Sequence, residues 1–90
     1  MDVYKQIKAE RRVQDAQWGG PEHDDNHTLS QWLDIIDRHK SRLWHVLVKQ
    51  QMGYLADQEA HQQSRDRLLK IAAICVAAIE ALDRQDGEDG

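Results

Sequence analysis

The sequence predicts an all-α protein: an antiparallel helical bundle that is completed by dimerisation. Three observations lead to this prediction. Apolar residues recur at helical spacing over two long segments, a capping box precedes the first of them, and the middle of the second is apolar on every side. The 90 residues are enough for one domain, which we place at 1–84, followed by a flexible acidic tail at 85–90.

The first predicted helix is short and covers residues 2–17. Asp2 is a suitable N-cap residue, because its carboxylate can accept a hydrogen bond from the backbone of the first turn. The segment "WGGPEHDDNH" follows at 18–27 and contains two glycines and a proline, which do not continue a helix. We therefore expect a loop of about ten residues there.

The second predicted helix begins after Thr28. The pattern "TLSQ" is a capping box with Thr28 at the N-cap and Gln31 at the third helical position. The apolar positions that follow have helical spacing; they are Leu29, Trp32, Leu33, Ile36, Leu43, Trp44 and Leu47. We expect Gly53 to end or bend this helix.

The third predicted helix covers residues 62–84, and the polar segment 54–66 is a short helix, a loop or its first turns. The apolar seam of this helix consists of Leu68, Ile71, Ala72, Cys75, Ile79 and Leu82. Its other middle positions are also apolar, so the helix needs neighbours on all sides. Two short neighbours from one chain leave part of it uncovered, and we expect a second subunit to complete its core.

The net charge, the length of the apolar runs and the cysteine count argue against several classes of protein. The net charge is −4, which gives no reason to expect nucleic-acid binding over the whole surface. The longest apolar run, Ile71–Ile79, is far shorter than the roughly 20 residues that span a bilayer, so we expect no membrane segment. The N-terminus lacks the apolar core of a secretory signal. The single cysteine excludes an intramolecular disulfide. We expect a cytoplasmic protein.

Three segments carry a resemblance to a known family. They are "ERRVQDAQWGGPEHDD", "WLDIIDRHKSRLW" and "DRLLKIAAICVAAIEALDR", and together they span residues 10–84. In this order they resemble the MazG-like branch of the all-α nucleoside triphosphate pyrophosphohydrolases, and most closely the short forms found in phages and mobile elements. The resemblance implies a homodimer or a dimer of dimers, and a Mg²⁺-dependent cleavage between the α- and β-phosphates of a nucleotide.

The chain departs from this family where the metal ligands belong. Five positions at which the resemblance implies carboxylate or polar oxygen carry basic residues. They are Arg38, His39, Arg42, Arg67 and Lys70. Arginine has no oxygen ligand to offer and repels a cation. We therefore expect Mg²⁺-dependent hydrolysis of nucleoside triphosphates to be weak or lost.

The acidic residues beside these positions leave two alternatives open. If the helices are shifted relative to the family, a smaller metal site can form from Asp34, Asp37 and Asp66. Otherwise Asp34 with Arg38, and Asp66 with Lys70, are ion pairs four residues apart on a solvated helix face. Such pairs stabilise a helix without contributing any chemistry.

A third alternative keeps the pocket and changes its ligand. Four cations on two packed helices would form an anion-binding cleft for a nucleotide that is bound and not cleaved; they are Arg38, Arg42, Arg67 and Lys70. The segment "HDDNH" at 23–27 is either an adventitious metal site or an exposed loop. The functional alternative to a pyrophosphohydrolase-related protein is thus a non-catalytic helical dimer that binds a protein partner or a nucleotide.

Overall fold

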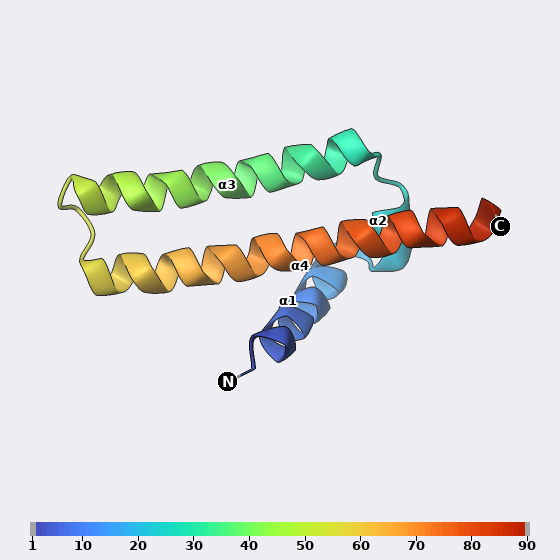
Figure 1. Cartoon of the computed structure of the whole chain (residues 1–90), viewed down its shortest axis with the longest axis horizontal. Helices are drawn as coiled ribbons and strands as arrows, with labels where there is room; N and C mark the ends of the chain where they lie inside the picture. Colours follow the sequence, from blue (N-terminus) through green and yellow to red (C-terminus); the bar gives the residue numbers. More distant parts are fainter. Residues whose placement is uncertain (1, 90) are drawn as a thin grey trace.

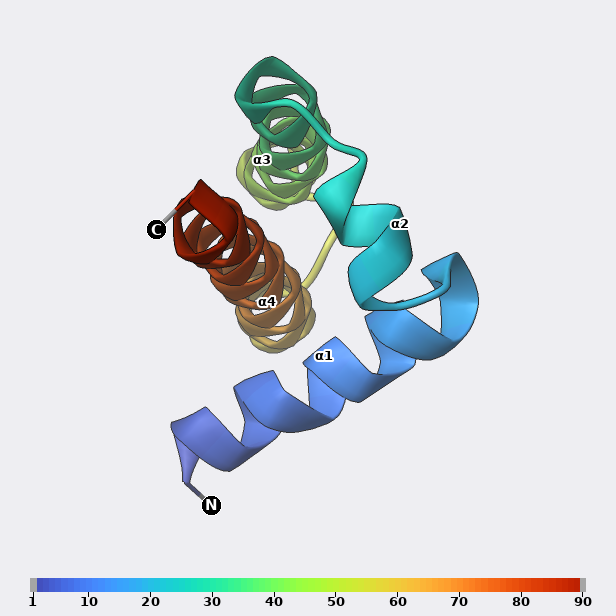
Figure 2. The same ribbon diagram turned by 90° about the vertical axis from the view of Figure 1, so that its right-hand side faces the viewer.

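The computed structural model describes the backbone of residues 2–89 and the side chains of residues 2–86, and this part of the chain contains helices and no strand. The four helices are α1 (Val3–Trp18), α2 (Pro21–Asp25), α3 (Leu29–Gln51) and α4 (Asp57–Asp89). Helices α3 and α4 run antiparallel, side by side (Figure 1). The view along the long axis shows α1, α2 and α3 arranged around α4 on three sides (Figure 2). The prediction of an all-α fold is confirmed.

Helix α1 begins and ends with local capping interactions. The Asp2 carboxylate accepts a hydrogen bond from the backbone N–H of Tyr4 at 2.9 Å, as predicted for an N-cap. At the other end Gly19 has a φ of 100°, a left-handed conformation that strongly favours glycine. The Gly19 N–H donates to the carbonyl of Asp15 at 2.9 Å. The predicted bounds of this helix are correct to within one residue.

The predicted loop at 18–27 contains the short helix α2, which the sequence analysis missed. Pro21 stands at the first position of α2, where its missing N–H costs nothing and its fixed φ suits a helix. The Asp24 N–H then donates to the Gly20 carbonyl at 3.1 Å. Proline was interpreted only as a residue that ends α1, whereas here it also begins the next helix.

The capping box of α3 is confirmed in both directions. Thr28 Oγ1 accepts from the Gln31 backbone N–H at 3.2 Å, and Gln31 Oε1 accepts from the Thr28 N–H at 2.7 Å. The helix ends at Gln51, and the turn that follows contains Gly53 with a φ of 80°. Glycine is again the residue that tolerates this conformation.

Helix α4 is longer than predicted at both ends. It begins at Asp57, so most of the ambiguous segment 54–66 forms its first turns. Its backbone is helical to Asp89, through residues assigned to the acidic tail. The predicted flexibility of that tail remains a prediction.

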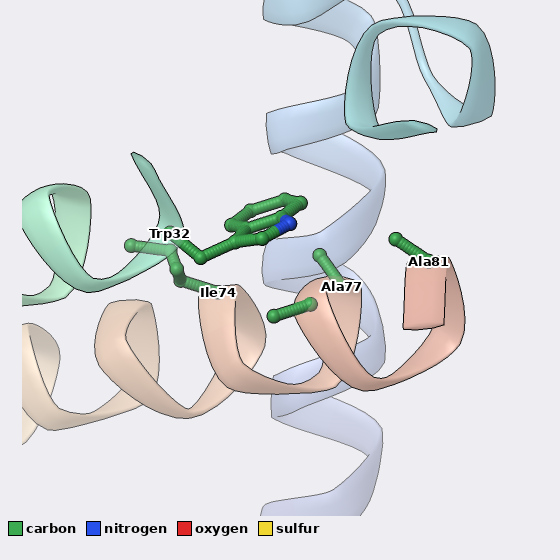
Figure 3. Close-up of a cluster of buried hydrophobic side chains, with 5 residues drawn as sticks. Trp32, Ile74, Ala77 and Ala81 are labelled. Carbon is green, nitrogen blue, oxygen red and sulfur yellow. The ribbon is translucent and has the colours of Figure 1, made fainter. Parts of the chain in front are cut away.

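The core is small and lies between α3 and α4. Trp32 of α3 is 3% exposed and packs against Ile74 and three alanines of α4 (Figure 3). The small alanine side chains leave room for the indole ring between the two helices. Because Trp32 supplies the largest side chain of this core, Trp32→Ala would cost roughly 3–5 kcal/mol of stability.

One side of α4 has no covering helix within the described residues. Leu68, Ile79 and Leu82 are exposed on α4, with Leu68 at the edge of a hollow that residues of α1 also line, although α1, α2 and α3 pack against its other sides. The expectation that a second subunit completes the core of α4 remains a proposal. Over residues 2–89, no helical stretch combines the length and the apolar character needed to cross a bilayer.

Candidate anion-binding cleft

An open cavity of about 320 Å³ is lined by residues from the end of α1, from α2 and the turn after it, and from α3. Its lining has an aromatic part and a basic part. The lining residues are Trp18, His23, His27, Ile35, Arg38, His39 and Arg42. No carboxylate belongs to this lining, so its charge is positive or neutral.

The aromatic part of the cavity is a row of rings. The ring centroids of Trp18 and His23 are 6.2 Å apart, those of His23 and His27 are 4.5 Å apart, and those of His27 and Trp32 are 4.8 Å apart. His27 Nδ1 donates to the backbone carbonyl of His23 at 2.9 Å, since a carbonyl can only accept. The row ends on the buried indole of Trp32, which fixes the cavity wall to the core.

Helix α2, which carries part of this wall, is held by charged contacts. Asp24 is 3% exposed, and its Oδ2 lies 3.5 Å from Nη2 of Arg11. Asp25 accepts a hydrogen bond from Arg84 of α4 and lies 2.7 Å from its Nη2, and this bond raises the pKa of Arg84. The expectation of an exposed "HDDNH" loop is therefore wrong for Asp24, whose carboxylate is buried beside a guanidinium.

His39 stands at the centre of the basic part. Its Nδ1 lies 3.0 Å from Nη1 of Arg67. Burial, followed by the positive charges of Arg67, Arg42, Lys70 and Arg38, lowers the pKa of His39 below its ordinary value of 6.5. A guanidinium can only donate, so the neutral imidazole accepts at Nδ1 and keeps its proton on Nε2. The structure thus brings together all five basic residues at the positions of the implied metal ligands.

The four residues predicted to bind an anion differ in whether they already have a side-chain partner within the chain. Lys70 forms an ion pair with Glu10 of α1 at 2.9 Å, and Arg67 is engaged with His39. Arg38 and Arg42 line the cavity, and within residues 2–86 neither forms an ion pair. These two guanidinium groups are therefore the ones available to an anion.

The three acidic residues proposed as a metal site do not come together as one group. Asp37 pairs with Lys40 at 3.2 Å, and it lines a shallow hollow on α3 together with Asp34. Asp66 accepts a hydrogen bond from Gln62 at 2.9 Å on α4. Over the described side chains, no three His, Cys, Asp or Glu residues are grouped as metal ligands.

The expected ion pairs four residues apart also do not form. Arg38 Nε lies 3.5 Å from the backbone carbonyl of Asp34, not its carboxylate. Lys70 pairs with Glu10 and leaves Asp66 to Gln62. The contact with α1 determines the partner of Lys70, which local spacing on α4 does not reveal.

A second cavity of about 310 Å³ continues the cleft along α3. Arg42 lines both cavities, and the second is otherwise lined by Ser41, His45, Val46 and Lys49. The spacing of Arg38, Arg42 and Lys49 places them along one side of the helix. The basic surface therefore extends from the aromatic rings toward the C-terminal end of α3.

The basic residues of this cleft were predicted from the sequence, whereas its aromatic wall was not. Trp18, His23 and His27 follow one another closely in sequence, but the short helix that turns their rings toward α3 was not predicted. An aromatic residue just before a Gly-Gly-Pro turn is the only local signal that could have suggested it. No protein-family model, no curated protein and no solved structure matches this chain.

Proposed function

We propose that this chain is a MazG-like, pyrophosphohydrolase-related protein that binds a nucleotide in the cleft and has weak or lost Mg²⁺-dependent hydrolysis. The observation that carries the proposal is the pairing of unlike surfaces across one cavity. Arg38 and Arg42, both without ion pairs among residues 2–86, lie on one side, and a row of aromatic rings lies on the other.

The basic side suits a phosphate group. Arginine donates two parallel hydrogen bonds to phosphate oxygens, and these charge-assisted bonds are about twice as strong as neutral ones. Two cations without acidic partners repel each other, so an anion between them relieves that repulsion. The adjoining cavity, with Lys49 in its lining, offers room for further phosphates along α3.

The aromatic side suits a base. Stacking of a base on an aromatic ring contributes about 1–3 kcal/mol, and it tolerates different bases. Trp18 and His27 present rings to the cavity, and the contact of His27 with Trp32 holds that ring in place. The volume of about 320 Å³ is at the lower end of ordinary ligand sites and accommodates one small ligand.

The chemistry of the lining supports binding over hydrolysis. Mg²⁺ prefers hard oxygen ligands in an octahedron, and the cavity lining supplies no carboxylate. A magnesium ion at this place would depend on the phosphates and on water for its ligands. We therefore expect Mg²⁺ to matter as a cofactor only if residual activity exists.

Calorimetric titration tests the proposed ligand. Wild-type protein in EDTA is titrated with AMP, ADP and ATP, and Arg42→Ala should weaken binding at least tenfold, or about 1.4 kcal/mol. Arg12→Ala is the matched control, because Arg12 is exposed on α1 and lies outside the cleft, and it should bind as wild type does. Equal affinities in all three proteins, or no binding at all, would refute the proposal.

A pyrophosphate assay with a panel of nucleoside triphosphates and Mg²⁺ or Mn²⁺ tests the loss of catalysis. We expect slow release or none. Rapid release that disappears in Asp34→Asn or Asp37→Asn protein would instead support an active enzyme with its metal on the acidic residues. Nucleotide binding without release would support the non-catalytic module.

A further inference from the structure

Helix α3, which lies side by side with α4 (Figures 1 and 2), carries large apolar side chains that remain exposed. Leu29, Leu33, Trp44 and Val48 are each between 45% and 58% exposed. Removing large apolar side chains of this exposure from water is favourable, so they are candidates for contact with a partner. With Asp37 and Lys40, which lie between them, they form what we term the outer stripe.

The outer stripe has the same order of apolar and charged positions from either end, with the signs of its two charges reversed. Two apolar residues are followed by one charged residue of each sign and then by two apolar residues. At about 100° per residue, all six positions fall within roughly a 100° arc of the helix. Their positions are symmetric about the peptide bond between residues 38 and 39.

We propose that a second copy of this chain docks on the outer stripe, with its α3 antiparallel and a two-fold axis passing between residues 38 and 39. An interface with two-fold symmetry must be complementary to itself. The axis places Leu29 opposite the partner's Val48 and Leu33 opposite the partner's Trp44. Asp37 then lies opposite the partner's Lys40, and the same contact is repeated on the other side of the axis.

The charged pair gives this arrangement its specificity. Asp37 and Lys40 already form an ion pair within the chain at 3.2 Å. In the antiparallel dimer each carboxylate lies between two ammonium groups, one from each chain. A parallel arrangement would instead bring the two carboxylates together, which costs free energy.

The apolar area is consistent with a homodimer of moderate affinity. The four apolar residues expose on the order of 400 Å² on each chain, about half of what a partner contributes to a standard interface. Flanking residues along the ~28 Å from Leu29 to Val48 supply the rest. Trp44 lies within the contact, and tryptophan is the residue type most enriched among residues that dominate binding.

The exposed side of α4 is the other apolar face that could meet a second copy. It contains Leu68, Ile79 and Leu82. Among the described side chains, no ion pair like that of Asp37 and Lys40 forms between these three residues. The outer stripe has one, and its use leaves the cleft open, because Arg38 and Arg42 lie on the opposite side of α3.

The test uses complementary charge changes. Asp37→Lys places two lysines on each stripe, and Lys40→Asp places two aspartates there. By sedimentation equilibrium, wild type should be a dimer at tens of micromolar, and each variant should dissociate at least tenfold more readily. An equimolar mixture of the two variants should dimerise again, because every lysine then faces an aspartate across the axis. Contacts within one chain cannot produce this recovery.

Two controls exclude general effects of charge or unfolding. Lys49→Asp changes the charge of α3 by the same amount on its far side and should leave the dimer unchanged, and circular dichroism should show equal helix content in all variants. A monomeric wild type, unaffected single variants or a mixture that stays monomeric would overturn the proposal. Loss of the dimer in Ile79→Lys with no effect of the charge changes would place the interface on α4 instead.

Discussion

At the scale of single residues, His39 is the group whose charge state responds most to the cations of the cleft. A histidine that is partly buried among four cations cannot easily take up a proton. Its neutral form is required for the contact with Arg67, because Nδ1 must accept. Protonation of His39 would thus add a fifth positive charge and remove a hydrogen bond at the same time.

The lowered pKa of His39 predicts a loss of stability at acidic pH. The folded protein binds this proton more weakly than the unfolded chain, so the free energy of unfolding falls as the pH drops below the ordinary value of 6.5 and toward the lowered pKa. Above that value His39 is neutral in both states and has no effect. His39→Gln should lose less stability than wild type between pH 7.5 and 5.5 in urea titrations.

His61→Gln is the control for this experiment, because His61 is exposed on α4. It should keep the wild-type dependence on pH. The same dependence in wild type and His39→Gln protein would show that burial and the surrounding cations do not lower the pKa of His39.

At the scale of elements, the local signals of the sequence predicted three of the four helices. The capping box at Thr28 and the apolar spacing of α3 and α4 involve residues close in sequence, so they can be recognised without a structure. The short helix α2 depends on distant partners, Arg11 and Arg84. Spacing within 18–27 gives no information about them, and for this reason the burial of Asp24 was missed.

The anchoring of α2 can be measured through Asp24. Asp24→Asn removes the charge that faces Arg11 within a buried setting, and it should reduce the free energy of unfolding by about 1–3 kcal/mol. The same variant should weaken nucleotide binding, because α2 carries the His23 ring of the cleft. Denaturant titration and calorimetry measure the two effects.

Asp25→Asn is the matched comparison, since Asp25 is the neighbouring carboxylate and its ion pair with Arg84 is exposed. Exposed pairs contribute at most about 1 kcal/mol. If both variants lose the same stability, the burial of Asp24 does not anchor α2.

At the scale of the whole molecule, the chain is elongated, with extents of 53 × 29 × 20 Å. Its buried core gathers around Trp32 and the alanines of α4, and long stretches of α3 and α4 have a side that no other described element covers. A small domain has little stability in reserve. The positions of apolar residues along the sequence predicted that α4 needs neighbours on all sides, but the exposed stripe on α3 could be recognised only from the arrangement of the helices in space.

The sequence also predicted which residues of the cleft are basic. It did not predict which of them already have a partner within the chain and which can bind an anion. Which cations are free depends on Glu10, which neutralises Lys70 from α1, and on His39, which engages Arg67. Both contacts join residues on different helices. The central proposal is that the cleft beside α2 binds a phosphate-bearing ligand through Arg38 and Arg42, without a metal.

Nuclear magnetic resonance tests that claim most directly, because the three tryptophans report on three different places. Trp18 lines the cleft, Trp32 lies in the core and Trp44 lies on the outer stripe. On titration of ¹⁵N-labelled protein with AMP in EDTA, we predict saturable shifts of the Trp18 indole N–H and of the Arg38 and Arg42 Nε–H signals, with Trp44 unchanged. A spectrum that does not change at Trp18 and the two arginines, or that changes at Trp44 instead, would contradict the account.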